Sequence, residues 1–253
     1  MNTTKYLNVK GIGYFVGFTA VTYSVSIVCD RLVSNFSLVL RLMVIVLLFI
    51  IMYLLAKVFY GNPFKQVCSA SFYDSLLHVL AFLFFGYVPS VIVIAIMGEK
   101  QLYLNAKPSF IDERSLHIPG YALIYWGLIG VMVAYFYHAT TYNLFGVKSR
   151  LAGVVAATLL FSVNYNTPFI SGYWNVWDML FFGLVFAYSY SVKSNPFALV
   201  FAYLMSEVPL WWCILAPFGD RVFSSYFLVR FFVSLIAFVI FVKSRKTGEK
   251  KTR

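Results

Sequence analysis

The sequence predicts an all-α integral membrane protein, a polytopic bundle of about eight transmembrane helices. Hydrophobic residues make up 61% of the chain and charged residues only 11%. Soluble domains have about 45–50% apolar and about 25% charged residues, so the composition falls well outside the soluble range. Nearly every residue lies in an apolar stretch or in a connection between two such stretches. The chain therefore has no room for a separate soluble domain.

Eight stretches are long and apolar enough to be spanning helices, for which about 20 residues are needed because hydrocarbon offers the backbone no hydrogen bonds. They lie near residues 11–29, 38–59, 72–97, 121–145, 151–165, 176–192, 196–216 and 226–242. The fifth and sixth are short for a bilayer. We therefore expect them to be inner helices, shielded from lipid by their neighbours.

Basic residues predict the orientation, because cytoplasmic loops retain Lys and Arg. With eight spans both termini share a side, and that side carries Lys5, Lys10, Lys57, Lys65, Lys148, Arg150, Lys193 and the basic residues of 243–253. We therefore expect both termini in the cytoplasm and the chain in the cell membrane. The net charge is +11. Because the basic residues flank the membrane, we expect their partners to be membrane lipids and not nucleic acid. Segment 243–253 is interpreted as a disordered anchor on anionic lipids.

We divide this single transmembrane domain into four parts by polarity. Residues 1–118 comprise three scaffold helices and an outer loop, 119–216 a core of helices four to seven, 217–242 the eighth helix and 243–253 a basic cytoplasmic tail. Most polar residues at membrane depth lie in the core. Function is expected there, because polar groups are costly in lipid.

Six core residues are candidates for a shared polar cavity: His138, Asn143, Asn164, Tyr165, Tyr203 and Glu207. Glu207 lies about midway along its span, where an ionised carboxylate costs several kcal/mol unless it is paired or protonated. His138 is its most obvious partner, and a protonated Glu207 bonded to a tyrosine or an asparagine is the alternative. Arg230, in the eighth helix, is expected to reach the outer interface with its long side chain.

Three core segments carry a family pattern. They are Phe161-Ser-Val-Asn-Tyr165, a glycine-containing segment from Phe182 to Tyr188, and Asn195-Pro-Phe-Ala-Leu-Val-Phe-Ala-Tyr203-Leu-Met-Ser-Glu207. In order and helix placement they resemble the intramembrane proteases that process CAAX and bacteriocin precursors, a family of eight-helix membrane proteins. The resemblance covers roughly residues 119–210. Gly61-Asn-Pro-Phe-Lys65 and the segment reaching Tyr87-Val-Pro89 look more loosely like the five-span Yip-type membrane domain, which has no catalysis.

The family's catalytic residues are missing from this chain. Tyr165 stands where the family has the histidine of its second motif, and Tyr203 and Glu207 stand in place of the His and Asn of its third. The first motif, E-E-x-x-x-R, fits two registers. One places Ala134-Tyr135 and Ala139 at its charged positions, and the other places His138-Ala139 and Asn143 there.

The chemistry of such proteases needs carboxylate and histidine side chains to hold a metal or activate a water. Tyrosine is largely protonated at neutral pH and is not among the side chains that zinc prefers. We therefore predict no catalytic residues, no metal and no cofactor. The resemblance implies a pseudoenzyme, a non-catalytic membrane protein that binds another integral membrane protein or a lipid-like ligand. An accessory structural subunit of a larger membrane complex is the alternative, and a transporter or a protease with an altered site ranks below both.

Overall fold

The structure is a computed structural model that describes residues 3–32, 38–66, 68–98, 119–147, 149–165 and 175–251. Every regular element within these ranges is a helix, so the all-α prediction is confirmed. The first three helices are α1 (Thr3–Leu32), α2 (Leu38–Phe59) and α3 (Phe72–Met97). They coincide with the first three predicted stretches, although α1 begins earlier than predicted.

Two of the later predicted stretches are not regular α-helices. The fourth comprises α5 (Pro119–Val131), the π-helix η2 (Met132–Thr140) and α6 (Thr141–Gly146). The fifth and sixth are α7 (Arg150–Tyr165) and α8 (Asn175–Val192). The seventh is divided into α9 (Pro196–Ser206), α10 (Val208–Leu215) and the short 3₁₀ helix η3 (Ala216–Phe218), and the eighth is α11 (Asp220–Lys251).

Several of these helices can cross a membrane. Over the described ranges, the candidates by length and composition lie in α2, α3, α5–α6 and α11, which makes four, or five if the bent pair α9 and α10 is one span. Helices α7 and α8 are apolar but shorter. Apolar helices of this length, with polar groups buried between them, identify a multi-pass membrane protein. The count of eight crossings stays a prediction.

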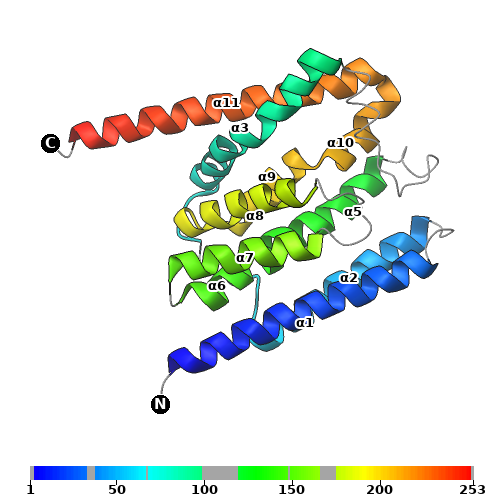
Figure 1. Ribbon diagram of the computed structural model, residues 1–253, viewed down its shortest axis with the longest axis vertical. Helices are drawn as coiled ribbons and strands as arrows, with labels where there is room; N and C mark the ends of the chain where they lie inside the picture. The colour runs from blue at the N-terminus through cyan, green and yellow to red at the C-terminus, as the bar shows by residue number, and fades with distance from the viewer. Residues whose placement is uncertain are drawn as a thin grey trace.

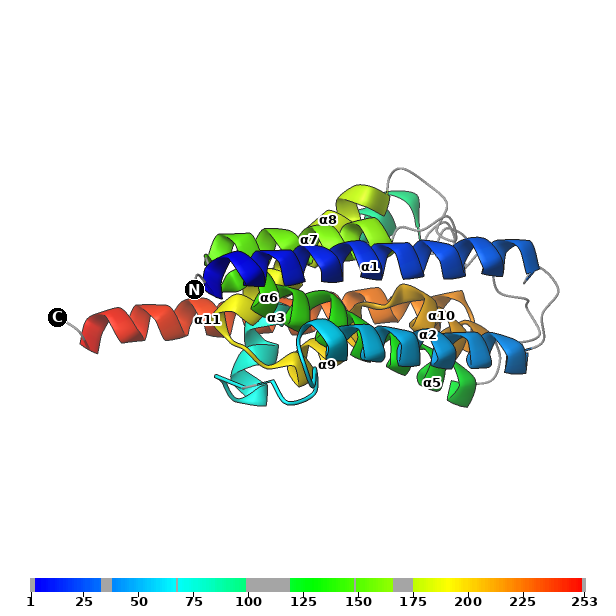
Figure 2. The ribbon, with the colours of Figure 1, turned by 90° about the horizontal axis from the view of Figure 1, so that it is seen from below.

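The segment α5–η2–α6 is the centre of the bundle. It packs against α1, α2, α7, α8, α9 and α10, and its span is 56% buried, compared with 17% for α2 and 28% for α11. Helices α1, α7 and α8 lie on one side of it and α2 and α9 on the other (Figure 2). Helices α3 and α11 pair with each other at one edge (Figure 1). Contacts in the centre therefore join segments far apart in sequence.

Helix α7 is not shielded as predicted. Leu151, Val155, Leu159 and Val163 recur every four residues and are 40–72% exposed, so they form an outward apolar stripe. The prediction of an inner helix is wrong for α7, because its short length does not prevent one face from reaching the bundle surface. Helix α8 is better covered; Leu184 is its one strongly exposed apolar side chain among those described.

Both marked ends of the chain lie at the same end of the bundle (Figures 1 and 2). The arrangement agrees with termini on one side of a membrane, while the cytoplasmic assignment stays a prediction. Helix α11 continues to Lys251. Segment 243–251 is thus helical, and its interpretation as a disordered tail is wrong, because the last apolar helix extends into it without a break.

Two glycines of the central layer provide a test of this packing. A Cβ on Gly153 would lie 2.9 Å from the backbone Cα of Gly146 and 2.7 Å from the Tyr142 ring, whereas a Cβ on Gly127 would meet open space. We expect Gly153→Ala to destabilise the protein by about 1–3 kcal/mol through overpacking of α6 on α7. Gly127→Ala should be neutral or slightly stabilising, because alanine favours helix. Thermal unfolding in mild detergent measures both; equal unfolding temperatures would contradict this packing.

Candidate functional site

The π-helix η2 is held by side chains that bond its own backbone. His138 Nδ1 donates to the carbonyl oxygen of Val133 at 2.8 Å, Thr140 Oγ1 to that of Tyr135 at 2.7 Å and Thr141 Oγ1 to that of Phe136 at 3.2 Å. Each of these bonds spans five residues, the same spacing as the backbone hydrogen bonds of a π-helix. The hydroxyl of Tyr14 in α1 also donates to the Phe136 carbonyl, at 2.9 Å. The backbone carbonyls of η2 thus accept side-chain hydrogen bonds at the buried centre of the bundle.

His138 is fully buried in an aromatic environment. Its ring lies 5.1 Å from that of Phe161 in α7 and 5.5 Å from that of Phe186 in α8. Its Nε2 makes no hydrogen bond of good geometry, and the nearby polar group is the backbone of Gly183 in α8. The imidazole therefore joins η2 to α7 and α8 and takes part in the packing of the core.

The seventh segment breaks at Glu207. Helices α9 and α10 meet there at 55°, and Glu207 itself has an extended backbone. Pro209 follows two residues later. A proline has no N–H to bond the carbonyl four residues earlier, which is that of Met205, and its ring crowds that carbonyl. The last turn of α9 is thus left with carbonyls that no backbone amide reaches.

Three side chains supply the missing donors at this break. Trp211 Nε1 donates to the carbonyl of Leu204 at 2.8 Å, the Tyr226 hydroxyl to that of Met205 at 2.7 Å and Arg230 Nη1 to that of Ser206 at 3.4 Å. Three consecutive carbonyls therefore each accept a bond from α10 or α11. Because lipid supplies no water to replace them, these bonds let a helix end inside the bundle.

Arg230 is the most unusual residue of the break. It is 5% exposed, and its guanidinium lies 4.3–5.0 Å from the ring centroids of Tyr87, Tyr226 and Phe227. It follows the start of α11 by ten residues, about 15 Å at 1.5 Å per residue, which is half of the hydrocarbon thickness. The prediction that Arg230 reaches the interface is wrong, because rings and a free helix carbonyl provide a site for the cation within the bundle.

Glu207 belongs to the same region. It is 9% exposed and directly precedes α10, where a carboxylate is favoured by the helix dipole. The Tyr87 and Ser206 hydroxyls share a hydrogen bond of 2.6 Å beside it. The break thus places a cation at the carboxyl end of one half-helix and an acid at the amino end of the next.

A second polar cluster, around Asn143 and Gln66, lies at the end of the bundle where α2 ends and α7 begins. Asn143 Nδ2 lies 3.2–3.3 Å from Tyr60, Gln66 and Tyr190, and the Tyr190 hydroxyl donates to Gln66 Oε1 at 2.8 Å. Gln66 Nε2 donates in turn to Thr140 at 3.2 Å. The cluster connects α6, α8 and η2 to the irregular segment after α2.

That segment, residues 60–66 and 68–71, is called the strap. The Ser69 amide donates to the Ser194 carbonyl at 2.9 Å, and Asn195 Nδ2 donates to the Ala70 carbonyl at 3.2 Å. The ring of Phe64 packs against aromatic rings of α2 and η2. The strap is therefore fixed across the end of the bundle by Gln66 in its middle and by the α8–α9 connection beyond it.

The six predicted site residues lie in different settings. Asn143 lies in the polar cluster at the basic end, His138 lies among the rings of α7 and α8, and Asn164 Nδ2 donates to Thr19 at 3.2 Å and to the Leu160 carbonyl. Tyr203 is buried against Gly130 of α5, and Glu207 lies at the break. The Tyr165 side chain is outside the described residues.

Sequence reasoning missed the donors that close the break and the strap. Trp211, Tyr226, Gln66 and Tyr190 have no motif around them. Pro209 was the available signal, since a proline within an apolar stretch leaves a carbonyl that needs another donor. Among the described His, Cys, Asp and Glu residues, no three gather as a metal site would require.

Comparison with known proteins gave no match among family models, curated proteins or solved structures.

The donors at the break allow a direct test. Tyr226→Phe removes the bond to the Met205 carbonyl and the 3.2 Å bond that the hydroxyl accepts from Arg230 Nη1, but keeps the ring beside Arg230. We expect a loss of about 1–3 kcal/mol of stability, the cost of a buried carbonyl left without a donor. Tyr73→Phe is the matched control, because Tyr73 is 65% exposed. Unfolding in detergent measures both, and a Tyr226→Phe protein as stable as the control would contradict the proposed closure.

The strap allows a second test. Asn143→Leu removes the amide that contacts Tyr60, Gln66 and Tyr190. We expect the strap to loosen and trypsin to cleave after the exposed Lys65 about tenfold faster, which corresponds to about 1.4 kcal/mol of lost protection. Asn164→Leu is the control, since that amide holds α7 to α1 away from the strap. Equal cleavage rates in the two variants would mean general loosening and would contradict the cluster's local role.

Proposed function

We propose that the chain is a non-catalytic multi-pass membrane protein that binds another integral membrane protein or a lipid-like ligand, on a fold related to the CAAX-type intramembrane proteases. One observation carries the proposal. Three polar residues of the core hold the bundle together: the His138 ring contacts rings of α7 and α8, Asn143 bonds the strap and α8, and Asn164 bonds α1. They serve cohesion of the bundle.

The residues at the family's reactive positions support the same proposal. Tyr203 packs against Gly130 of α5, and Glu207 directly precedes α10, next to Ser206, whose carbonyl Arg230 bonds. A carboxylate in that position stabilises a helix end. Broken membrane helices in transporters turn their free ends toward a substrate. Here the carbonyls of α9 instead accept bonds from Trp211, Tyr226 and Arg230.

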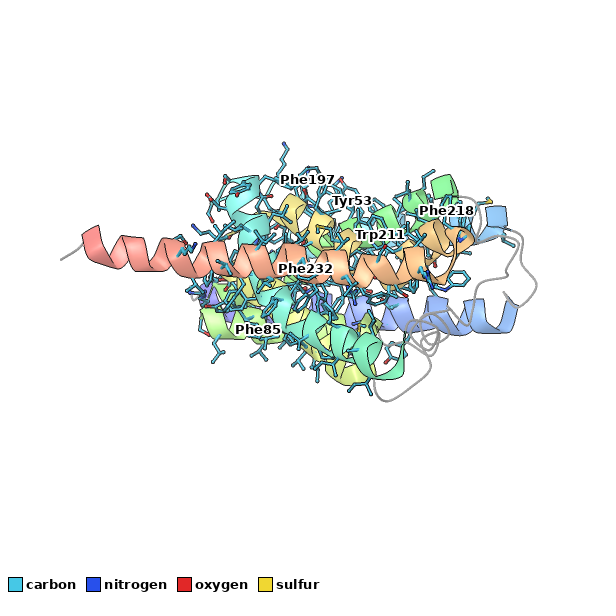
Figure 3. The ribbon with its side chains drawn as sticks, turned by 90° about the horizontal axis from the view of Figure 1, so that it is seen from above. Tyr53, Phe85, Phe197, Trp211, Phe218 and Phe232 are labelled. Atoms are coloured by element: carbon cyan, nitrogen blue, oxygen red, sulfur yellow. The ribbon has the colours of Figure 1, made fainter. Side chains whose placement is uncertain are left out.

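The outer surface suits a partner within the membrane. Large apolar side chains are exposed on α2, α7, α9 and α11, and Figure 3 labels several outward aromatic residues, including Phe85, Phe197 and Phe232. Phe72, Phe197 and Phe201 form an exposed aromatic group with centroids 5.1–5.7 Å apart. Such a surface also fits the accessory subunit of a larger complex, our second candidate function.

Purification from source membranes in mild detergent tests the proposal. We expect an integral membrane protein in fixed ratio to the chain, or a lipid-like molecule retained through exchange into a new detergent, both identified by mass spectrometry. A chain that elutes alone and free of such a molecule would contradict the proposal. One tightly bound zinc per chain together with peptide hydrolysis would replace it with an active protease.

A further inference from the structure

Arg150 is an exposed cation whose guanidinium is held in place by helix α8. Its Nε donates to Ser191 Oγ at 3.0 Å, and its Cζ lies 5.3 Å from the ring centroid of Tyr188. The Ser191 hydroxyl donates to the Tyr188 carbonyl at 2.6 Å, so its oxygen is turned to accept from Arg150. Within the described part of the chain, the two Nη groups of Arg150 make no hydrogen bond. A fixed guanidinium thus keeps both Nη groups available to a ligand.

Arg150 lies at the level of the bundle where lipid headgroups are expected. It is the first residue of α7, and Ser191 is next to the last residue of α8. Helix α8 has 18 residues, or about 27 Å, which is close to the hydrocarbon thickness of about 30 Å. Lys193 follows Ser191 by two residues and is exposed. The fixed arginine and a second cation therefore lie near the boundary between hydrocarbon and headgroups.

A narrow apolar strip of α8 begins beside Arg150. Leu184 precedes Tyr188 by four residues and is 49% exposed, so Leu184, Tyr188 and Ser191 share one face of the helix. From Ser191 to Leu184 the strip extends about 10 Å along the axis. Helix α8 packs against α7 and against α3, which cover its other faces. The cation and the strip are thus arranged like the headgroup and the upper acyl chain of a phospholipid.

We propose that Arg150 binds the phosphate of an anionic phospholipid, one acyl chain of which lies on α8 over Tyr188 and Leu184. The inference rests on the proposed function and names the class of its lipid-like ligand. Arginine presents a planar fork of donors that matches the oxygens of a phosphate, and a fork that is already fixed loses less entropy on binding. An anionic headgroup is favoured over a zwitterionic one, because Lys193 attracts a negative charge and repels a choline group.

A helix of a partner protein fits this site less well. A carboxylate can accept from Arg150, but a packed helix needs exposed positions over several successive turns. Among the described side chains of α8, Leu184 is the one strongly exposed apolar residue. A single acyl chain needs no more than such a strip, and lipid surrounds the bundle in the membrane.

The experiment measures binding to the whole chain in mild detergent by native mass spectrometry. Dioleoyl phosphatidylglycerol is the anionic probe, dioleoyl phosphatidylcholine the zwitterionic comparison and inorganic phosphate the comparison without acyl chains. Arg150→Gln removes the guanidinium. Lys57→Gln is the matched control, because it removes one exposed positive charge from the last turn of α2, on the other side of the bundle centre (Figure 2).

A second measurement locates the lipid. Phosphatidylglycerol that carries a photoreactive diazirine in one acyl chain is incorporated into nanodiscs with the wild-type protein or with either variant. After illumination, the labelled peptides are identified by mass spectrometry.

We expect the wild type and Lys57→Gln to bind phosphatidylglycerol at least about tenfold more tightly than phosphatidylcholine and Arg150→Gln to lose this preference. The diazirine should label residues 181–188 in the wild type and in Lys57→Gln, and label them less in Arg150→Gln. Equal phosphatidylglycerol binding by the two variants, or equal affinity of the wild type for both lipids, would overturn the site while leaving the proposed function intact.

Two other results would assign Arg150 to a different ligand. Inorganic phosphate bound as tightly as phosphatidylglycerol would make the ligand a free phosphate and overturn the lipid. An integral membrane protein that co-purifies with Lys57→Gln and not with Arg150→Gln would make the ligand a protein. Wild-type protein that retains neither a lipid nor a membrane protein would contradict the proposed function itself.

Discussion

The structure depends on one constraint, that every backbone carbonyl at membrane depth needs a donor from the protein itself. Two places in the bundle depart from regular α-helix, the π-helix η2 and the break at Glu207. In η2 the backbone bonds span five residues, and His138, Thr140 and Thr141 add side-chain donors to three of its carbonyls. At the break, Trp211, Tyr226 and Arg230 supply the donors for three carbonyls at the end of α9. Hydrocarbon would make the break costly without these donors.

The same constraint explains why the core contains polar residues. A buried histidine, asparagine or arginine in a membrane protein invites a catalytic or transport interpretation. Here each one has a described interaction that ties one segment to another, from Tyr14 of α1 to Arg230 of α11. These interactions hold the helices of the described bundle together, which is the observation that the proposed function rests on.

The fold was largely predictable from sequence, because long apolar stretches allow little besides helices in lipid. The site was less predictable. Composition identified the polar core and Glu207, but donor and acceptor pairs such as Tyr226 with Met205 or Asn143 with Gln66 join residues 21 and 77 positions apart, and no local pattern encodes them. Arg230 was misplaced for the same reason, since its aromatic surroundings come from α3 as well as α11. Pro209 could have located the break.

Hydrogen–deuterium exchange of the chain in lipid nanodiscs tests the central claim most directly. The amides of Val208 and Leu210, in the first turn of α10, have no acceptor within that helix, so their exchange reports whether water reaches the break. We predict exchange as slow as that of the buried helix η2, because side chains and not water occupy the carbonyls of α9. Exchange within seconds at Val208 and Leu210 would mean that the break is hydrated and open, which would contradict the proposed closure.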